Sequence, residues 1–442
     1  MGRCAGDPVW LAGGASRRRA ARRGALVNPP SPLRGFGEAS DAAAQRRLNV
    51  LQVCDHLGWE GSRMHGVKRL FAWMIPRFDP ARYNVSLVSL RKKDLSEETL
   101  DALGIDITYL HKSRFDPATL PALLKIIGRK RIDILHLHGY GATTFGRCAG
   151  MMRGLPTILH EHANLTDTPW FQKVADRLLA PATDIAIAVS KSTAEFVIKA
   201  RQMPAERVKV VYLGVPLEEF SRKRSPEEIA DARRELGIGA DEWAVGTITR
   251  LHDSKGNSYL VDSAQQVLQE RSNTRFFLFG EGPLRADLES QARSLGLGDR
   301  VVFGGFARDV ARVLSAFDVS VFPSLWEGTP LTVFEALAMG KAIVATDADG
   351  LLDVLTPDRE AVIVPKRDAN ALARAVVHVL DHPEERARLS GNARLKGQQY
   401  DIATFVRRME RLYDLLHRVS RSTKRRGVLQ ADLTFLTGGI RA

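Results

Sequence analysis

Short apolar runs alternate with helix-like stretches along most of this chain, and the alternation restarts once. The first series contains the runs LNVLQVC, YNVSLVSL, IDITYL, IDILHLH, PTILHEH, TDIAIAVS and VKVVYL. The second series contains WAVGTIT, TRFFLFG, RVVFGG, DVSVFPS, KAIVAT and AVIV. Strands that alternate with helices form parallel sheets with helices on both faces. The sequence therefore predicts an α/β protein with two Rossmann-like, doubly wound domains, whose ligand cleft lies where the carboxyl ends of the strands face each other.

A polar, helix-rich connector at 219–240 separates the two series. We therefore expect an N-terminal Rossmann-like domain at 48–218 and a C-terminal one at 219–400. The amphipathic stretch DIATFVRRMERLYDLLHRV follows and predicts a final helix at 401–419. Of these parts, the second domain carries the sharpest motifs.

Most of the formal net charge of +13 lies in two tails, an extension at 1–47 and a segment at 420–442. The extension is rich in Gly, Ala, Arg and Pro, and we expect it to be disordered. A basic tail can touch anionic lipid or nucleic acid without reading a sequence. The composition therefore predicts no specific nucleic-acid partner and leaves peripheral membrane contact as an option.

The three cysteines, Cys4, Cys54 and Cys148, form no close pair. This spacing argues against a disulfide framework or a cysteine-based zinc site and suits a reducing compartment. No apolar run approaches the roughly 18 residues that a membrane span needs. The N-terminus lacks the apolar core of a secretory signal. We expect a cytoplasmic protein, with a peripheral position at the inner face of the plasma membrane as the alternative.

The stretch VKRLFAWMIPRF, residues 67–78, mixes basic with large apolar residues. One interpretation is an amphipathic helix that touches a membrane. The other is a helix packed in the core, with its basic residues in solvent.

The segment FPSLWEGTPLTVFEALAMGKAIVAT, residues 322–346, predicts a strand, a helix and a second strand. Thr329 is a candidate N-cap, and Pro330 stands where the first helical residue belongs. The free N–H groups of Leu331, Thr332 and Val333 would then face whatever lies above the strand end. A helix N-terminus of this kind binds anions, phosphate in particular.

Two carboxylates flank this predicted anion site, Glu327 before the helix and Glu335 within it. A carboxylate beside a phosphate is useful if it accepts hydrogen bonds from neutral hydroxyls. Glu335 would then bind a ribose and Glu327 a second sugar. Together these features are typical of a nucleotide-sugar pocket.

A second segment, WAVGTITRLHDSKGNSYL, points to the same pocket. It predicts a strand followed by a loop that carries Arg250 and Lys255, with Gly256 next to the lysine. A guanidinium and an ammonium group can neutralise a diphosphate and stabilise it as a leaving group.

These residues resemble the retaining GT-B glycosyltransferases of the large family four, also called glycosyl transferases group 1. The spacing from Glu327 to Glu335 matches the family's Glu-x7-Glu signature, within the wider frame of an FPS strand end, an EGxP turn and an EAxAxG helix. The loop with Arg250 and Lys255 is similar to the family's G-R-L-x-x-x-K-G motif, with Thr249 where glycine is usual. The resemblance covers roughly 48–418.

The resemblance implies a metal-independent glycosyltransferase that moves a sugar from a UDP- or GDP-linked donor to an acceptor hydroxyl, with retention. Acceptors in the family include glycolipids, polysaccharides and small metabolites. It places Glu327 by the donor sugar, Glu335 by the ribose, and the last helix back on the first domain. It also matches Gly61 with a loop glycine at the diphosphate and His162 with a histidine beside the reacting centre. The implied catalytic residues are Glu327, His162, Arg250 and Lys255, and the implied donor-binding residues are Arg250, Lys255, Glu327, Gly328, Thr329, Pro330, Leu331, Thr332, Glu335 and Gly61.

Two pairs of histidines follow strands of the first series, in HLHGYG and HEHAN. Each pair shares one face of its strand, because side chains alternate along a strand. A metal site formed by His136, His138, His160 and His162 is one interpretation. The other is that they satisfy backbone groups at the strand ends. As acceptor-side candidates we place His162 first and His138 second, and we expect no metal.

Two further patterns imitate binding motifs. Asp347 and Asp349 form a DxD sequence typical of metal-dependent sugar transferases with another fold, and we do not expect them to bind a metal. Gly280 and Gly282 form a GxG loop, which alone is a weak nucleotide signal.

Two alternatives to a glycosyltransferase remain open from the sequence. A GT-B sugar-nucleotide 2-epimerase would bind the same donor without an acceptor. A non-catalytic binding protein would act through its basic tails.

Overall fold

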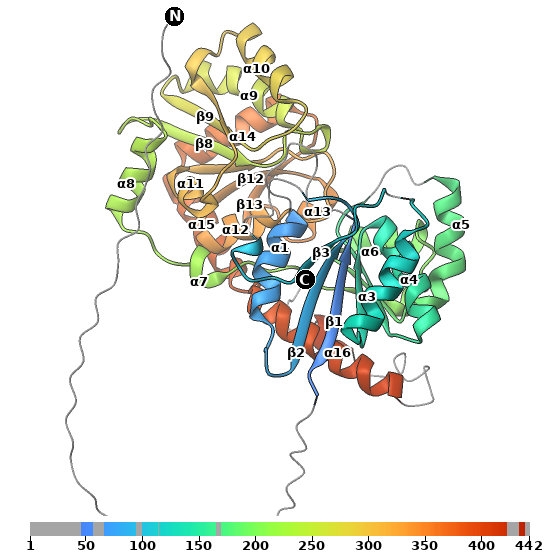
Figure 1. Cartoon of the computed structure of the whole chain (residues 1–442). Coiled ribbons are helices and arrows are strands. Elements are labelled where there is room, and N and C mark those ends of the chain that lie inside the picture. Colours follow the sequence, from blue (N-terminus) through green and yellow to red (C-terminus); the bar gives the residue numbers. More distant parts are fainter. Residues whose placement is uncertain are drawn as a thin grey trace, which may run out of the picture. The chain divides into compact units, whose positions relative to one another are not determined.

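The computed structural model describes residues 46–55, 66–93, 100–113, 115–164, 169–421 and 433–437. Most of the N-terminal extension and Gly61 therefore lie outside the described residues. Within 46–442, which form one compact unit, the chain builds two sheets whose strands all run parallel (Figure 1). The predicted fold class, two doubly wound α/β sheets, is confirmed.

The first sheet has seven strands in the order β3-β2-β1-β4-β5-β6-β7. Its strands are β1 (Leu48–Cys54), β2 (Tyr83–Ser89), β3 (Ile107–Tyr109), β4 (Ile134–His138), β5 (Thr157–Glu161), β6 (Ile185–Ala188) and β7 (Val208–Val210). Its helices are α1 (Gly66–Met74), α3 (Thr119–Lys130), α4 (Tyr140–Arg153), α5 (Trp170–Leu179) and α6 (Lys191–Lys199), with short 3₁₀ turns η1 (Ile75–Arg77), η2 (Ala180–Ala182) and η3 (Ala205–Arg207).

The second sheet has six strands in the order β10-β9-β8-β11-β12-β13. Its strands are β8 (Trp243–Ile248), β9 (Thr274–Phe279), β10 (Val301–Gly305), β11 (Val319–Phe322), β12 (Ala342–Thr346) and β13 (Ala361–Val364). Its helices and turns are η4 (Asp253–Lys255), α9 (Asn257–Glu270), α10 (Arg285–Ser294), η5 (Gly298–Arg300), α11 (Val310–Ala316), α12 (Leu331–Met339), α13 (Asp349–Leu352), α14 (Ala369–Asp381) and α15 (Pro383–Gly397).

The strand order reverses direction once in each sheet, next to β1 in the first and next to β8 in the second. In open parallel sheets, ligands bind outside the carboxyl ends of the strands at such a switch point. The central strands are buried on both faces, and β11 and β12 among them have largely apolar sequences. The switch points therefore direct attention to the loops after β1 and β4, and after β8 and β11.

The connector between the sheets contains α7 (Leu217–Phe220) and α8 (Pro226–Glu235). Helix α8 begins with a capping box, in which the Ser225 side chain accepts from the Glu228 N–H and the Glu228 side chain accepts from the Ser225 N–H. The helix-rich character expected at 219–240 is thus present.

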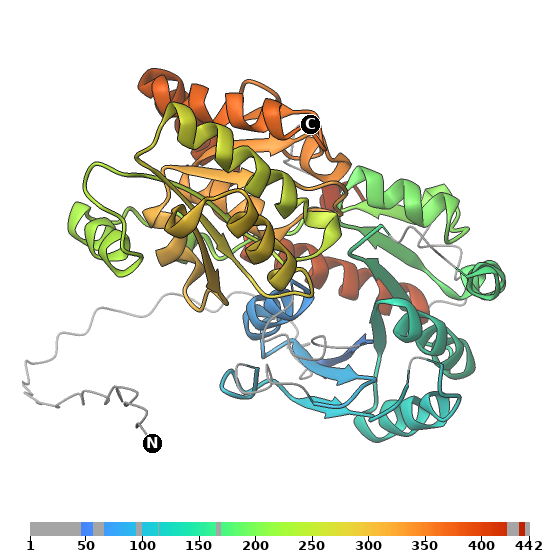
Figure 2. The same ribbon diagram turned by 90° about the horizontal axis from the view of Figure 1, so that it is seen from above.

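The long helix α16 (Ile402–Arg421) follows the second sheet in sequence but packs against β4 and α1 of the first. Figures 1 and 2 show it in red beside the blue and teal strands. Gly214 lies so close to this junction that an added Cβ would come within 2.5 Å of the Asp401 carbonyl carbon. Farther on, α18 (Thr434–Thr437) packs on α16 and β7, and its Leu436 is buried. Part of the predicted basic tail therefore belongs to the folded protein.

Helix α1 settles the two interpretations of residues 67–78. Leu70, Phe71 and Met74 are fully buried, so the helix packs in the core. The expectation that its basic residues face solvent is wrong in part, because Lys68 is buried and Arg69 forms an ion pair inside the protein.

Candidate functional site

Two cations and a carboxylate meet at the carboxyl edge of the second sheet. Lys255, in the turn after β8, forms an ion pair with Glu327, in the loop after β11. Burial lowers the pKa of Arg250, and the nearby charge of Glu327 acts in the opposite direction. Glu327 also accepts a hydrogen bond of 2.9 Å from the Ser324 hydroxyl, and it is 8% exposed. We call Arg250, Lys255 and Glu327 the charged cluster.

Backbone contacts hold the two loops of the charged cluster together. The Leu325 N–H donates to the Ser254 carbonyl at 2.8 Å. Gly256 adopts a positive φ of 60°, and an added Cβ would lie 2.0 Å from the Pro323 carbonyl oxygen. A side chain at this position would therefore push the two loops apart. The glycine next to Lys255 serves this close approach.

The N-terminus of α12 differs in detail from the prediction. The helix begins at Leu331, and Pro330 rather than Thr329 occupies the N-cap position. The Thr329 hydroxyl donates to the Gly328 carbonyl at 2.6 Å and lies 3.4 Å from the Gly350 carbonyl. The N–H of Val333 donates to the Pro330 carbonyl and is therefore not free. No side chain caps the helix, which leaves the N–H groups of Leu331 and Thr332 as the candidates for an anion.

Glu335 lies on the first turns of α12 and is fully buried. It forms an ion pair with Arg69 of α1, which sequence reasoning did not find. Burial raises the pKa of this carboxyl group, while the charge of Arg69 acts against that rise. Apart from the ion pair, neither carboxylate oxygen has a hydrogen-bond partner among the described residues. Glu335 therefore retains acceptor capacity.

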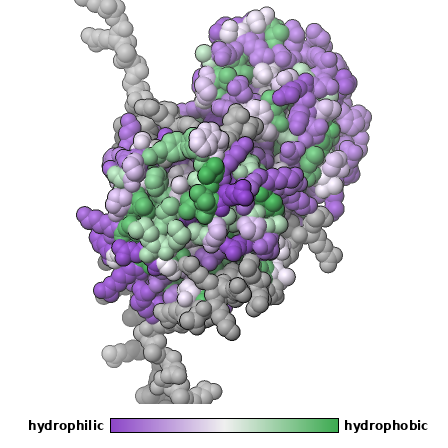
Figure 3. All heavy atoms as spheres, turned by 90° about the vertical axis from the view of Figure 1, so that its right-hand side faces the viewer, coloured by the Kyte–Doolittle hydropathy of each residue, from purple (hydrophilic) through white to green (hydrophobic). Residues whose placement is uncertain are grey.

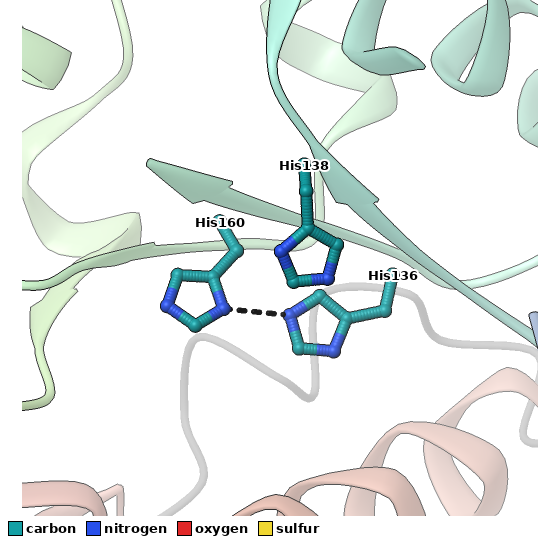
Figure 4. Close-up of side chains that lie close together, drawn as sticks. All are labelled: His136, His138 and His160. Atoms are coloured by element: carbon teal, nitrogen blue, oxygen red, sulfur yellow. Dashed lines mark hydrogen bonds between the residues drawn. The ribbon is translucent and has the colours of Figure 1, made fainter. Parts of the chain in front are cut away.

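Four imidazole rings stack at the carboxyl edge of the first sheet. Strands β4 and β5 pair with His138 opposite His160, and His162 follows the end of β5. The ring centroids of His136 and His160 are 5.2 Å apart, and those of His138 and His162 are 5.1 Å apart. Figure 4 shows three of these rings converging. Burial lowers the pKa of His136 and of His162 to about 3 and holds the pKa of the other two well below the ordinary value. We call these residues the histidine stack, and all four rings are neutral near pH 7.

Hydrogen bonds of the stack lead to Gln52 of β1 and Tyr413 of α16. The Gln52 amide donates to the Tyr413 hydroxyl at 2.9 Å, and its carbonyl oxygen lies 2.7 Å from His138 Nε2. That carbonyl can only accept, so Nε2 of His138 carries the proton. His138 Nδ1 must then accept, and it lies 2.8 Å from His162 Nε2. The network thus assigns the proton of neutral His162 to Nε2 and a lone pair to its Nδ1.

The other branch of the network runs from Tyr413 through His136. The Tyr413 hydroxyl accepts from Gln52, so it donates to His136 Nδ1 at 2.8 Å. His136 then donates from Nε2 to His160 Nδ1 at 3.1 Å. His160 Nε2 has no hydrogen-bond partner among the described residues. The expectation that these histidines satisfy backbone groups is wrong, because their partners are side chains.

The rings of His136, His138 and His160 offer nitrogen atoms within 4.8 Å of one another, which is the spacing of a candidate metal group. A metal ion needs unprotonated ring nitrogens. Binding here would have to displace the proton that His136 donates to His160. The hydrogen bonds therefore account for the stack without a metal.

The charged cluster and the histidine stack approach each other through the backbone. A Cβ added to Gly328 would lie 2.5 Å from the carbonyl oxygen of His162. A Cβ added to Gly350 would lie 1.9 Å from the carbonyl oxygen of Gly328. Of the predicted site residues that the structure describes, Arg250 and Lys255 meet Glu327, and His162 lies next to Gly328. Glu335, on α12, pairs instead with Arg69. His138 lies behind His162 with both ring nitrogens engaged.

The imitating motifs have structural explanations. Asp347 accepts a 2.8 Å hydrogen bond from the Lys366 N–H. Added Cβ atoms at Gly280 and Gly282 would lie 1.8 and 2.1 Å from the carbonyl oxygens of Thr249 and Leu251. The GxG loop thus packs on the backbone that leads to Arg250.

A hollow of about 800 Å³ at Trp243, Asp318 and Lys341 lies at the opposite, amino edge of the second sheet.

Both halves of the chain match glycosyltransferase families. Residues 64–219 match the model described as Glycosyltransferase Family 4, and residues 228–396 match Glycosyl transferases group 1. An uncharacterized glycosyltransferase of Methanocaldococcus jannaschii is 28% identical over 61% of this chain and 72% of the relative. A UDP-Gal:alpha-D-GlcNAc-diphosphoundecaprenol alpha-1,3-galactosyltransferase of Escherichia coli is 24% identical over 60% of this chain and 71% of the relative.

Solved structures agree in fold. Anabaena HepE in complex with UDP and glucose superposes with a TM-score of 0.71 at 20% identity, over 83% of this chain and all of that one. The lipopolysaccharide glycosyltransferase WaaG superposes with a TM-score of 0.62 at 16% identity, over 83% and 99%. The two family models together match the strands from β2 to β13 in chain order, and the chain belongs to the group 1, family 4 glycosyltransferases, which have the GT-B fold and use nucleotide sugars.

Proposed function

We propose that this glycosyltransferase uses a UDP-linked sugar and transfers it, with retention, to a hydroxyl group of a lipid-linked acceptor. The observation that carries the proposal is the charged cluster beside the uncapped N-terminus of α12. The E. coli relative, which uses UDP-Gal and a diphosphoundecaprenol-linked acceptor, supports the choice of both substrates. In this chain, the domain at 48–218 would bind the acceptor and the domain at 219–400 would bind the donor. The helix at 401–419 would connect the two domains.

The diphosphate would bind Arg250, Lys255 and the N–H groups at the start of α12. Negative charge grows on the diphosphate as the glycosidic bond breaks, so fixed positive groups here stabilise the transition state. Lys255 now pairs with Glu327. A diphosphate would compete for the lysine and release Glu327 for the hydroxyls of the donor sugar. Glu335, which retains acceptor capacity, would bind the ribose hydroxyls.

His162 would accept a hydrogen bond from a sugar or acceptor hydroxyl. The network leaves a lone pair on its Nδ1 and keeps the ring neutral. His138 would hold His162 in this tautomer rather than touch the acceptor. Gly61, beyond the described residues, remains a predicted contact of the diphosphate. No step in this scheme requires a metal.

No helix among the described residues has the length and apolar character to cross a bilayer. We propose that the enzyme acts in the cytoplasm, at the inner face of the plasma membrane, where a lipid-linked acceptor is available.

The test is a thermal-shift and product analysis with UDP-sugars and GDP-sugars. A donor that binds the folded state raises the melting temperature, by more the higher its concentration is relative to its Kd. We expect a UDP-sugar to stabilise the wild type and to lose most of that effect in Glu335→Ala. Transfer to a lipid-linked sugar, with the anomer read by NMR, would support the assignment. Conversion of the donor to its 2-epimer without an acceptor, or no shift with any nucleotide sugar, would refute it.

A further inference from the structure

Helix α5 has its polar side inside the protein and its apolar side in solvent. Trp170, Val174 and Leu178 recur at intervals of four residues, so they share one face of the helix. They are 77%, 49% and 73% exposed, and Phe171 beside them is 44% exposed. A helix that packs on a sheet normally buries its apolar face. The orientation of α5 is therefore the reverse of the usual one.

A buried ionic network fixes this orientation. Asp176 pairs with Arg147 of α4 and with Arg201, and all three side chains are buried. The Tyr140 hydroxyl also donates to Asp176, at 3.1 Å. Rotating α5 to hide its apolar face would leave Arg147 and Arg201 buried without this partner, which is strongly unfavourable. The ion pairs of Asp176 thus keep the apolar face of α5 exposed to solvent.

Neighbouring segments extend the apolar surface. The ring of Phe115, 53% exposed, packs edge-on against Phe171 with centroids 5.6 Å apart. Met151 and Met152 are exposed at the end of α4, which packs against α5. Figure 3, which views the side of the molecule where α5 lies in Figure 1, shows apolar side chains gathered next to hydrophilic ones. We call this surface the α5 face: Phe115, Met151, Met152, Trp170, Phe171, Val174 and Leu178.

Among the described residues, the exposed charges of α5 and of the end of α4 are positive, and Asp116, beside Phe115, pairs with Lys112 at 3.8 Å. Lys173 and Arg177 are the exposed charged residues of α5, and Arg153 is exposed beside the two methionines. Within α5, all of which is described, the single acidic residue is the buried Asp176. Exposed apolar residues flanked by lysine and arginine are typical of a helix that lies in a membrane interface.

We propose that the α5 face docks this enzyme on a membrane surface that contains anionic lipid. Apolar residues would enter the boundary between headgroups and acyl chains, and the basic residues would contact lipid phosphates. A second copy of the chain fits less well, because a two-fold dimer places the same patch on both subunits and would bring the positive charges of Lys173 and Arg177 from both copies into one interface. The proposal extends the proposed function, on whose lipid-linked acceptor it rests.

The test measures flotation of the full-length protein with vesicles of phosphatidylcholine, with and without phosphatidylglycerol. We compare the wild type with a triple variant, Trp170→Ser, Val174→Ser and Leu178→Gln. All three residues are exposed, so we expect an unchanged melting temperature. Binding to anionic vesicles should weaken roughly tenfold or more. The matched control is Leu395→Gln on α15, because Leu395 is also 73% exposed.

Two more variants sharpen the result. The double change Lys173→Glu and Arg177→Glu should weaken binding to anionic vesicles and leave binding to phosphatidylcholine alone unchanged. Brominated lipid should quench the fluorescence of the wild type more than that of Trp170→Phe, because Trp170 would lie in the interface.

Equal vesicle binding by the wild type and the triple variant would overturn the proposal and leave the basic tails as the lipid contact. Concentration-dependent dimerisation that the triple variant abolishes, without vesicle binding, would also overturn it and assign the face to a second copy. The assay uses no sugar donor, so its outcome is separate from that of the nucleotide-sugar test.

Discussion

The two sheets present opposite chemistries at their carboxyl edges. The first sheet carries the histidine stack, in which neutral rings donate and accept hydrogen bonds. The second carries the charged cluster, in which two cations surround one carboxylate. The same strand–helix architecture thus supports a hydrogen-bonding edge and an electrostatic edge. The difference teaches that the residues at the strand ends, rather than the fold, set the chemistry of each edge.

The largest effect on kcat/KM is expected from removing the positive charge of Lys255 at the carboxyl edge of the second sheet. Lys255→Ala should lower kcat/KM by about 10²–10³-fold, because an ammonium group that stabilises the leaving diphosphate is lost. The rate of sugar release from the UDP-sugar donor checks this. Lys366→Ala, in the loop after β13, is the control and should keep wild-type activity. Wild-type activity of Lys255→Ala would show that the lysine does not stabilise the leaving diphosphate.

A smaller loss of kcat/KM is expected when the imidazole ring of His162, at the carboxyl edge of the first sheet, is removed. His162→Asn should reduce kcat/KM by about 10²-fold, within the range of general acid–base and orienting groups. Because burial lowers the pKa of His162 to about 3, the ring stays neutral from pH 5 to pH 9 in the wild type. The pH profile of kcat/KM should therefore show no step near the ordinary histidine value of about 6.5. A step there that His162→Asn removes would contradict the assignment.

The histidine stack should also make stability depend on pH, in a direction opposite to that of a salt-bridged histidine. Unfolded histidine binds a proton below about pH 6.5, whereas folded His136 and His162 do so only near pH 3. Stability is thus complete above pH 6.5 and falls as the pH drops towards 3, by about 1.4 kcal/mol per unit for each such ring. Denaturant unfolding between pH 7 and pH 5 measures this. His136→Gln should reduce the slope, and His378→Gln, on the exposed side of α14, should leave it unchanged.

The smallest effect on activity is expected from a change at Tyr413, which forms a hydrogen bond with the histidine stack. Tyr413→Phe removes the hydroxyl that accepts from Gln52 and donates to His136. Leaving these buried groups unpaired should cost about 1–3 kcal/mol of unfolding free energy. Activity should fall less than in His162→Asn, since the branch through His138 is intact. Tyr413→Phe with the stability of the wild type would show that the network does not hold the stack.

The sequence predicted what local patterns encode. Apolar runs gave the strands, and residues close in sequence to the strand ends gave Arg250, Lys255, Glu327 and Glu335. The partner of Glu335 could not be predicted, because Arg69 lies in a helix of the other sheet. Tyr413 reaches Gln52 across 361 positions, a contact that no local period signals. Both partners arise from packing between distant segments.

Two errors have a shared cause. Threonine is a residue type that favours the N-cap position, yet the Thr329 hydroxyl forms hydrogen bonds with the carbonyl groups of Gly328 and Gly350. The basic residues of α1 were expected in solvent, yet Arg69 meets a buried carboxylate. In α5, likewise, the ion pairs of Asp176 with Arg147 and Arg201 decide which face of the helix is buried. In each case a tertiary partner overrides a local preference.

The central claim is that the charged cluster binds the diphosphate of the donor. Titration calorimetry of UDP and of uridine, with the wild type and Arg250→Ala, tests it most directly. We predict that the wild type binds UDP at least about 10-fold more tightly than uridine, a difference of roughly 1.4 kcal/mol or more. Arg250→Ala should lose most of this advantage while its affinity for uridine stays the same. An unchanged ratio of the two affinities in Arg250→Ala would contradict the account.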